Sequence, residues 1–136
     1  MEQNKDNKNK CVHLAFKPSY FYELNQQNRA CVDCRAPMPT FASINNGTLI
    51  CQNCAREHIK LGYEVSYIRK LVSQWDMYIL NFIVRGGNQR FLKLCTDYDL
   101  FELPIEYKYK TKITFYYRAM VKYFKIFILL FLIKSE

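Results

Sequence analysis

Four cysteines carry the clearest chemistry in this 136-residue chain. They are Cys31, Cys34, Cys51 and Cys54, in the run CVDCRAPMPTFASINNGTLICQNC. The two Cys-x-x-Cys pairs are sixteen residues apart, and each pair can turn two thiolates toward one ion. Four thiolates complete a tetrahedral site and leave no open position for water. The spacing therefore predicts one structural Zn²⁺.

The N-terminus, MEQNKDNKNK, is polar and contains no apolar stretch of the signal-peptide type. This favours a cytoplasmic chain, in which thiols stay reduced and paired cysteines hold metal rather than form disulfides. Cys11 and Cys95 have no such partner and are expected to be a surface thiol and a core thiol. His58 is expected on a helix with an ordinary hydrogen bond, because the thiolates already fill the metal site.

The order of apolar and turn residues predicts one mostly helical domain with a small sheet. Two short strands are expected between the cysteine pairs, at 41–44 and 48–50. Helices are expected at 19–29, after Cys54 up to Gly62, from a Ser73/Asp76 capping box to Val84, from Asn88 to Cys95, and from Pro104 to Ile128. We expect a disordered polar N-terminus at 1–15, a zinc domain at 16–125 and an apolar tail at 126–136.

Further motifs around the cysteines resemble those of the Arf GTPase-activating protein (ArfGAP) domain family, over roughly residues 20–124. PMPTFASI follows the first pair in place of a PxPxWAS-like run, and CQNCAREHIKLG contains the second pair with a histidine and a leucine-glycine pair. The other matches are Asn28, Ser66, Arg69, Trp75, GGN at 86–88 and the closing segment IEYKYKTKITFYYRAMVKYF.

The resemblance implies a small α+β fold: a four-cysteine zinc-finger domain with a three-stranded sheet flanked by helices. It also implies binding to a GTP-bound Arf-family small GTPase in membrane traffic, into which the domain inserts an arginine finger. Such a guanidinium stabilises the charge on the transferring phosphoryl group and is worth on the order of a thousandfold or more in rate. The chain would then be a GTPase activator, not itself an enzyme. The implied partner-binding positions are Phe41, Ile59, Lys60 and Arg69.

The chain departs from the family pattern at the finger itself. The family places its arginine five residues after the fourth cysteine, and Ile59 stands there. Arg56 and Lys60 are the nearby cations, but Lys60 is turned about 100° around a helix from Ile59 and lacks the planar fork of arginine. We expect both to be solvated surface charges. Two interpretations stay open: an activator with a displaced finger, and a catalytically inactive Arf-binding module.

A net charge of +8 indicates an acidic partner. A GATA-like nucleic-acid-binding zinc finger is an alternative, since its four-cysteine layout is similar. The stretch between the cysteine pairs contains only one cation, Arg35, and the helix after Cys54 carries only Arg56 and Lys60 against Glu57. A nucleic-acid module needs several cations near its reading element. The charge placement therefore argues against nucleic acid.

The C-terminal residues 126–133, IFILLFLI, are uninterrupted apolar residues after a basic segment. They are too few for a membrane span, which needs about twenty. They could be buried on the domain, or inserted at a membrane interface with lysines toward anionic headgroups, or mark the end of a chain whose relatives carry further domains. Insertion would give a peripheral location on Golgi or endosomal membranes. The basic residues are Lys108, Lys110, Lys112, Arg118, Lys122 and Lys125.

Overall fold

The computed structural model describes residues 13–124. The helices within them are α1 (Pro18–Leu24), α2 (Gln52–Ile59), α3 (Met77–Arg85), α4 (Asn88–Asp97), α5 (Ile105–Lys108) and α6 (Lys112–Lys122), with a 3₁₀ turn η1 (Gln26–Arg29). The strands are β1 (Leu14–Ala15), β2 (Phe41–Ser43), β3 (Thr48–Ile50), β4 (Ile68–Lys70) and β5 (Gln74–Trp75).

The strands form two antiparallel sheets. In the larger, of order β3-β2-β4, Ala42 of the central strand faces Leu49 on one side and Arg69 on the other. The smaller sheet pairs β1 with β5. The three-stranded sheet flanked by helices confirms the expected α+β class, whereas the two-stranded sheet was not predicted.

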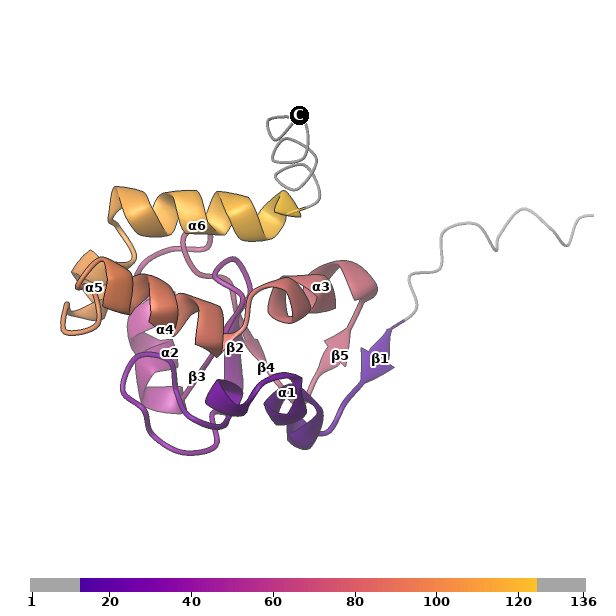
Figure 1. Cartoon of the computed structure of the whole chain (residues 1–136). Coiled ribbons are helices and arrows are strands. Elements are labelled where there is room, and N and C mark those ends of the chain that lie inside the picture. Colours follow the sequence, from indigo (N-terminus) through magenta and orange to yellow (C-terminus); the bar gives the residue numbers. More distant parts are fainter. Residues whose placement is uncertain (1–12, 125–136) are drawn as a thin grey trace, which may run out of the picture.

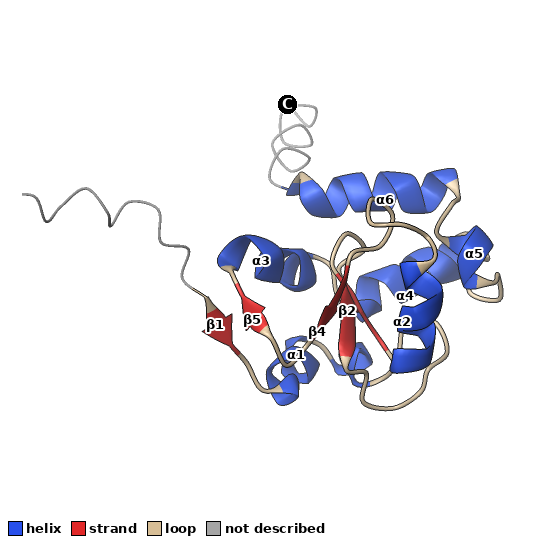
Figure 2. Ribbon diagram, turned by 180° about the vertical axis from the view of Figure 1, so that it is seen from behind, coloured by secondary structure: helices blue, strands red, loops and turns tan. Residues whose placement is uncertain are grey.

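The helices surround the three-stranded sheet on several sides. In Figure 1, α2, α4 and α5 lie on one side of this sheet and the β1-β5 sheet lies on the other, with α6 running above α4 and the sheet and ending near α3. The reverse view in Figure 2 shows the same arrangement. Helix α2, which follows the second cysteine pair, packs against β2, β4 and α5. The sheet therefore fixes the position of the helix that carries Ile59.

Aromatic side chains fill much of the core. Trp75 is fully buried, packs 5.0 Å from the ring of Phe21 and donates its indole N–H to the carbonyl of Leu71. Phe91 of α4 stacks on Tyr109 with ring centroids 5.4 Å apart, and Tyr117 of α6 meets Phe91 edge-on. These contacts hold α4 and α6 together, since burying each such ring stabilises the fold by roughly 1.5–3 kcal/mol.

Asn88 joins the start of α4 to the lead-in of the first cysteine pair. Its side-chain oxygen accepts from the backbone N–H of Leu49, and its amide nitrogen donates to the carbonyls of Leu49 and Ala30. Its own backbone N–H donates to the side chain of Asn28. Asn28, Leu49 and Asn88 are fully buried, and Ala30 is half-buried. Asn88, the asparagine of the GGN motif, therefore has a structural role.

Gly47, in the turn between β2 and β3, has a backbone φ of +65°. A Cβ added there would lie 2.5 Å from the carbonyl oxygen of Phe82, so the hairpin and α3 can approach this closely only at a glycine.

The N-terminal elements differ from the expected ones. Leu14 and Ala15 already pair with β5, so ordered structure begins before the expected domain start at residue 16. The single helix expected at 19–29 is wrong: Asn25 is extended, and its side chain accepts the N–H of Asn28 to cap η1. Residues 1–12, which include Cys11, lie outside the described part of the chain.

The helix expected after Ser73 begins only at Met77. Asp76 is its N-cap, with the carboxylate accepting the N–H of Ile79 at 2.8 Å. The hydroxyl of Ser73 instead donates to the carbonyl of Lys70 in the turn between β4 and β5. The predicted capping box was therefore wrong, while the helix itself is confirmed. The helix expected from Asn88 to Cys95 is also confirmed and continues to Asp97.

The long helix expected from Pro104 is divided into α5 and α6. Thr111 caps α6 by accepting the N–H of Thr114, and both hydroxyls also donate to the carbonyl of Lys108 at the end of α5. The apolar residues keep a helical spacing across the break because Tyr109 and Tyr117, which lie on either side of it, are both buried against the ring of Phe91. The remainder of the predicted helix, at 125–128, and the tail at 126–136 lie outside the described residues.

Candidate metal centre and partner surface

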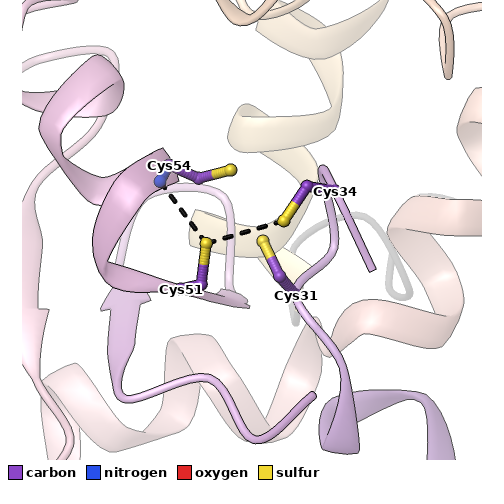
Figure 3. A group of neighbouring side chains, drawn as sticks. All are labelled: Cys31, Cys34, Cys51 and Cys54. Carbon is purple, nitrogen blue, oxygen red and sulfur yellow. Dashed lines mark hydrogen bonds between the residues drawn. The ribbon is translucent and has the colours of Figure 1, made fainter. Parts of the chain in front are cut away.

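The four cysteines converge from the turn that contains Cys31 and Cys34 and from the start of α2, as Figure 3 shows. Their Sγ atoms all lie within 4.8 Å of one another, and those of Cys34 and Cys51 are 3.6 Å apart. Zn–S bonds of about 2.3 Å in a tetrahedron put sulfur atoms about 3.8 Å apart. The predicted metal ligands are thus at zinc-ligand distances. Among residues 13–124 the cysteines form no disulfide, and Cys95 is a buried thiol outside this cluster, as expected.

The surroundings of the sulfur atoms also suit a divalent cation. Burial raises the pKa of Cys31 to about 11 and raises that of Cys54 further, so these thiols need a nearby positive charge to become thiolates. The Sγ of Cys51 caps α2 by accepting the N–H of Cys54 at 3.5 Å. The residues fit Zn²⁺, which would clamp the start of α2 to the first cysteine pair and would have no position free for a reactant.

Asp33, between the first two cysteines, connects this loop to α2 and α5. Its side chain is 3% exposed. One carboxylate oxygen is 2.7 Å from His58 Nε2, and the other accepts from the hydroxyl of Tyr109 at 2.6 Å and from Lys108 Nζ at 3.2 Å. Burial alone would raise the pKa of Asp33, but the hydrogen bond and charge of His58 and the charge of Lys108 together hold the pKa below its ordinary value. Asp33 is therefore a buried carboxylate with three partners.

A chain of hydrogen bonds continues from His58 into the sheet. His58 Nδ1 is 2.7 Å from Ser66 Oγ, which is 2.7 Å from Ser43 Oγ. Asp33, His58 and Ser66 thus have the order of a hydrolase triad, but Ser66 is only 3% exposed and its Oγ is held by Ser43. A nucleophile must reach its substrate. The arrangement is structural: it holds the histidine that precedes Ile59, and it confirms the ordinary hydrogen-bonding role expected for His58.

The ArfGap family model, described as "Putative GTPase activating protein for Arf", matches residues 19–122. That range is well over half of the chain. The chain belongs to the ArfGap family. The resemblance seen in the sequence is therefore confirmed over nearly the range on which it was based.

Curated relatives match parts of this ArfGap domain. The human "Arf-GAP with Rho-GAP domain, ANK repeat and PH domain-containing protein 2" is 41% identical over 69 residues, which are 48% of this chain and 4% of the relative. The mouse "ADP-ribosylation factor GTPase-activating protein 3" is 31% identical over 97 residues, 70% of this chain and 18% of the relative. The chain thus corresponds to a small part of the length of each relative.

A solved structure shares the fold of this ArfGap domain. It is that of a "putative GTPase activating protein for ADP ribosylation factor" from Cryptosporidium parvum, with a TM-score of 0.66 and 23% sequence identity. The superposition covers 76% of this chain and 87% of that chain. At this identity the likeness concerns the fold, and it supports the α+β class.

Ile59, the residue expected at the arginine-finger position, is the last residue of α2. Its side chain is 64% exposed, while the preceding His58 is fully buried. A helix that buries one residue turns the next by about 100°, here toward solvent. The hydrogen bonds of His58 thus present residue 59 outward at the helix end.

The two cations considered as substitutes lie on the exposed side of α2. Arg56 is exposed, three residues before Ile59. Lys60 Nζ is 3.0 Å from a carboxylate oxygen of Glu57, and both side chains are more than half exposed. A surface pair of this kind is weak, so it does not prevent Lys60 from moving.

Phe41 and Arg69, the other expected partner-binding residues, lie in the three-stranded sheet. Phe41 is half-buried at the start of β2. Arg69 is half-buried on β4, where its guanidinium donates to the Tyr67 hydroxyl and the Gln74 carbonyl and lies 5.7 Å from the centroid of the Trp75 ring. The structure thus gives Arg69 three internal contacts, whereas Ile59 and Lys60 face solvent.

Sequence reasoning missed Asp33, Lys108 and Tyr109. A charged residue inside a Cys-x-x-Cys pair was a local signal for Asp33. Lys108 was instead counted as part of the basic C-terminal surface, although its side chain is only 2% exposed. Nothing local indicates this burial, because its partner Asp33 is 75 residues away in sequence.

We predict that Cys51→Ser abolishes retention of the zinc. Serine is a good N-cap and keeps an oxygen at the start of α2, so the loss reports on metal ligation rather than on helix capping. The matched control Cys95→Ser changes a buried thiol outside the cluster and should keep one zinc per chain. Metal content after dialysis against a weak chelator, with circular dichroism of each sample, measures both effects.

Removal of the zinc from the unmodified chain with a strong chelator should unfold it, because binding of a structural zinc contributes directly to folding. Undiminished zinc in Cys51→Ser would contradict the four-thiolate site, as would an unchanged unfolding midpoint after metal removal.

Proposed function

We propose that the chain acts on an Arf-family small GTPase in its GTP-bound form, binding it through the exposed end of α2. The observation that carries this proposal is Ile59, 64% exposed at the family's finger position while the helix beneath it is held by the cysteine cluster and by His58. The family and the names of its relatives support this partner. The contact surface comprises Ile59, Lys60 and the start of the central strand β2 at Phe41, with Arg69 of β4 at its margin.

The chain regulates the GTPase and is not itself the hydrolase. An arginine at residue 59 would donate hydrogen bonds to the transferring phosphoryl group, but isoleucine has no donor and no charge. Its absence removes a contribution on the order of a thousandfold or more. Arg56 and Lys60 are the cations within reach of the same helix end, so any remaining stimulation depends on them.

The second candidate function is an Arf-binding module that does not accelerate hydrolysis. The side chains at the end of α2 favour it, because Ile59 has no donor and Lys60 lacks the planar fork with which arginine binds a phosphoryl group. In either case the chain takes part in vesicle-mediated transport at the cytoplasmic face of Golgi or endosomal membranes, where Arf-type partners work.

Restoring the finger should restore catalysis. We predict that Ile59→Arg raises the single-turnover rate of GTP hydrolysis on a GTP-loaded Arf by about a thousandfold over the unmodified chain. The control Val72→Arg adds the same charge at a side chain that is 72% exposed, in the turn between β4 and β5. It should leave the rate unchanged.

The outcomes of this assay are distinct. An Ile59→Arg chain that binds the GTPase without accelerating GTP hydrolysis would contradict the proposed role of residue 59. If the unmodified chain accelerates hydrolysis and Arg56→Ala or Lys60→Ala removes the acceleration, the result supports an activator with a displaced finger. If a saturating concentration of the unmodified chain gives no acceleration, the result supports the binding module. Failure to bind any GTP-loaded Arf contradicts the proposed partner.

We also propose that the basic face of α6 and the turn before it contact an anionic membrane surface. Lys110, Lys112 and Lys122 are exposed. Lys108 and Arg118 do not contribute: Lys108 is buried against Asp33, and Arg118 donates to the carbonyl of Tyr109. Within residues 13–124 no helix is long and apolar enough to cross a bilayer. Because this contact rests on exposed lysines, we propose that the attachment is electrostatic and reversible.

Charge reversal on this face should weaken the attachment. We predict that the double substitution Lys112→Glu and Lys122→Glu lowers binding to phosphatidylserine-containing vesicles by about tenfold or more in a flotation assay. Lys93→Glu, an exposed change on α4, is the control and should have little effect. Binding that is equal for all three chains, or unaffected by added salt, would rule out the electrostatic contact.

A further inference from the structure

A groove of about 650 Å³ lies between α3, α6 and the loop at 63–67. Its volume is within the range of pockets that hold ligands. Its floor and walls include the aliphatic side chains of Ile44, Val65, Ile79 and Ala119. We call it the aromatic groove after its six rings, those of Tyr63, Tyr67, Tyr78, Phe82, Phe115 and Tyr123.

Four of these rings are largely exposed to solvent. Tyr63 is 71% exposed, Tyr78 64%, Phe115 61% and Tyr123 47%. Single exposed aromatic residues are common, but several around one hollow mark a surface that another apolar group covers. The rings come from the loop after α2, from α3 and from α6. The aromatic groove is thus a binding surface formed by three separate elements.

The sequence supplies an apolar segment next to this groove. Residues 126–133, IFILLFLI, begin two residues after Phe124, at which the described structure ends. Helix α6 ends at Lys122, with Tyr123 as its C-cap. Lys122 and Tyr123 both line the groove. The apolar segment therefore leaves the described chain at one end of the groove.

The length of the segment is sufficient to follow the groove. Eight residues in extended form reach about 26 Å. Helix α6, which forms one wall, has 11 residues and is about 16 Å long. We propose that residues 126–133 dock in the aromatic groove of the same chain and cover its exposed rings.

Charges of both signs line the groove: Glu64 and Asp76, and Arg118 and Lys122. The Asp76 carboxylate caps α3, whereas Glu64 is exposed and has room for a lysine partner such as Lys125, which precedes the apolar segment. The match between groove and segment therefore rests on the apolar rings and on the place where the segment begins, with Glu64 as the available acidic contact.

The covalent connection favours this occupant over a second copy of the chain. A segment attached two residues from the groove has an effective local concentration in the millimolar range, far above that of a free partner.

Two adjacent aromatic residues of α6 provide a matched test. Phe115 lines the groove, whereas Tyr116 is not among the lining residues. Their side chains are 61% and 65% exposed, so arginine at either position should be tolerated by the fold, which a thermal melt confirms. Hydrogen–deuterium exchange of residues 126–133 is measured in the full chain without membranes. Phe115→Arg should speed their exchange by about tenfold or more, whereas Tyr116→Arg should leave it as in the unmodified chain.

Cleavage by chymotrypsin at Phe127 and Phe131 gives a second readout and should accelerate in Phe115→Arg alone. Equal exchange and cleavage in the three chains would overturn the proposal. So would protection of the segment that grows with protein concentration, which indicates a second copy, or that arises only when anionic vesicles are added, which indicates membrane insertion.

Discussion

The buried carboxylate of Asp33 is the group on which the arrangement of the described elements depends most. It lies between two zinc ligands and contacts His58 of α2, Lys108 of α5 and Tyr109 directly after α5. A buried carboxylate is stable only when it is paired and hydrogen-bonded, and here its three partners come from two distant parts of the chain. Zinc bound by the flanking cysteines would hold Asp33 in place, and Asp33 in turn holds α2 and α5 beside the cysteine cluster.

The exposed end of α2 follows from this constraint. The cysteine cluster fixes the start of the helix through Cys51 and Cys54, and the bonds of His58 to Asp33 and Ser66 fix its end. Residue 59 is therefore presented outward by a rigid support, whichever side chain it carries. In this chain the support of the ArfGap fold is intact, while the group that it presents is an isoleucine. A stable domain is compatible with any exposed side chain at residue 59, because the buried network does not involve that side chain.

The sequence was sufficient for those features that depend on neighbouring residues. The cysteine spacing predicted the metal ligands, and the Pro- and Gly-containing stretch between the pairs predicted two strands, found at Phe41–Ser43 and Thr48–Ile50. It was insufficient where long-range contacts decide. Thr111 and Thr114 set the break between α5 and α6. The hydroxyl of Thr111 caps the start of α6, and the hydroxyl of Thr114 donates to the carbonyl of Lys108 at the end of α5. Lys108 looked like a surface charge because its partner is 75 residues away.

The most direct test of this account compares Asp33→Ala with Asp97→Ala in the zinc-loaded chain by urea unfolding. Asp97 pairs with Lys93 at 2.9 Å on the exposed face of α4, so its removal should change the free energy of unfolding little. Removal of the Asp33 carboxylate leaves a buried lysine, a histidine and a tyrosine hydroxyl without their partner. We predict a loss of about 3–5 kcal/mol for Asp33→Ala. A loss as small as that of Asp97→Ala would contradict the central role of this carboxylate.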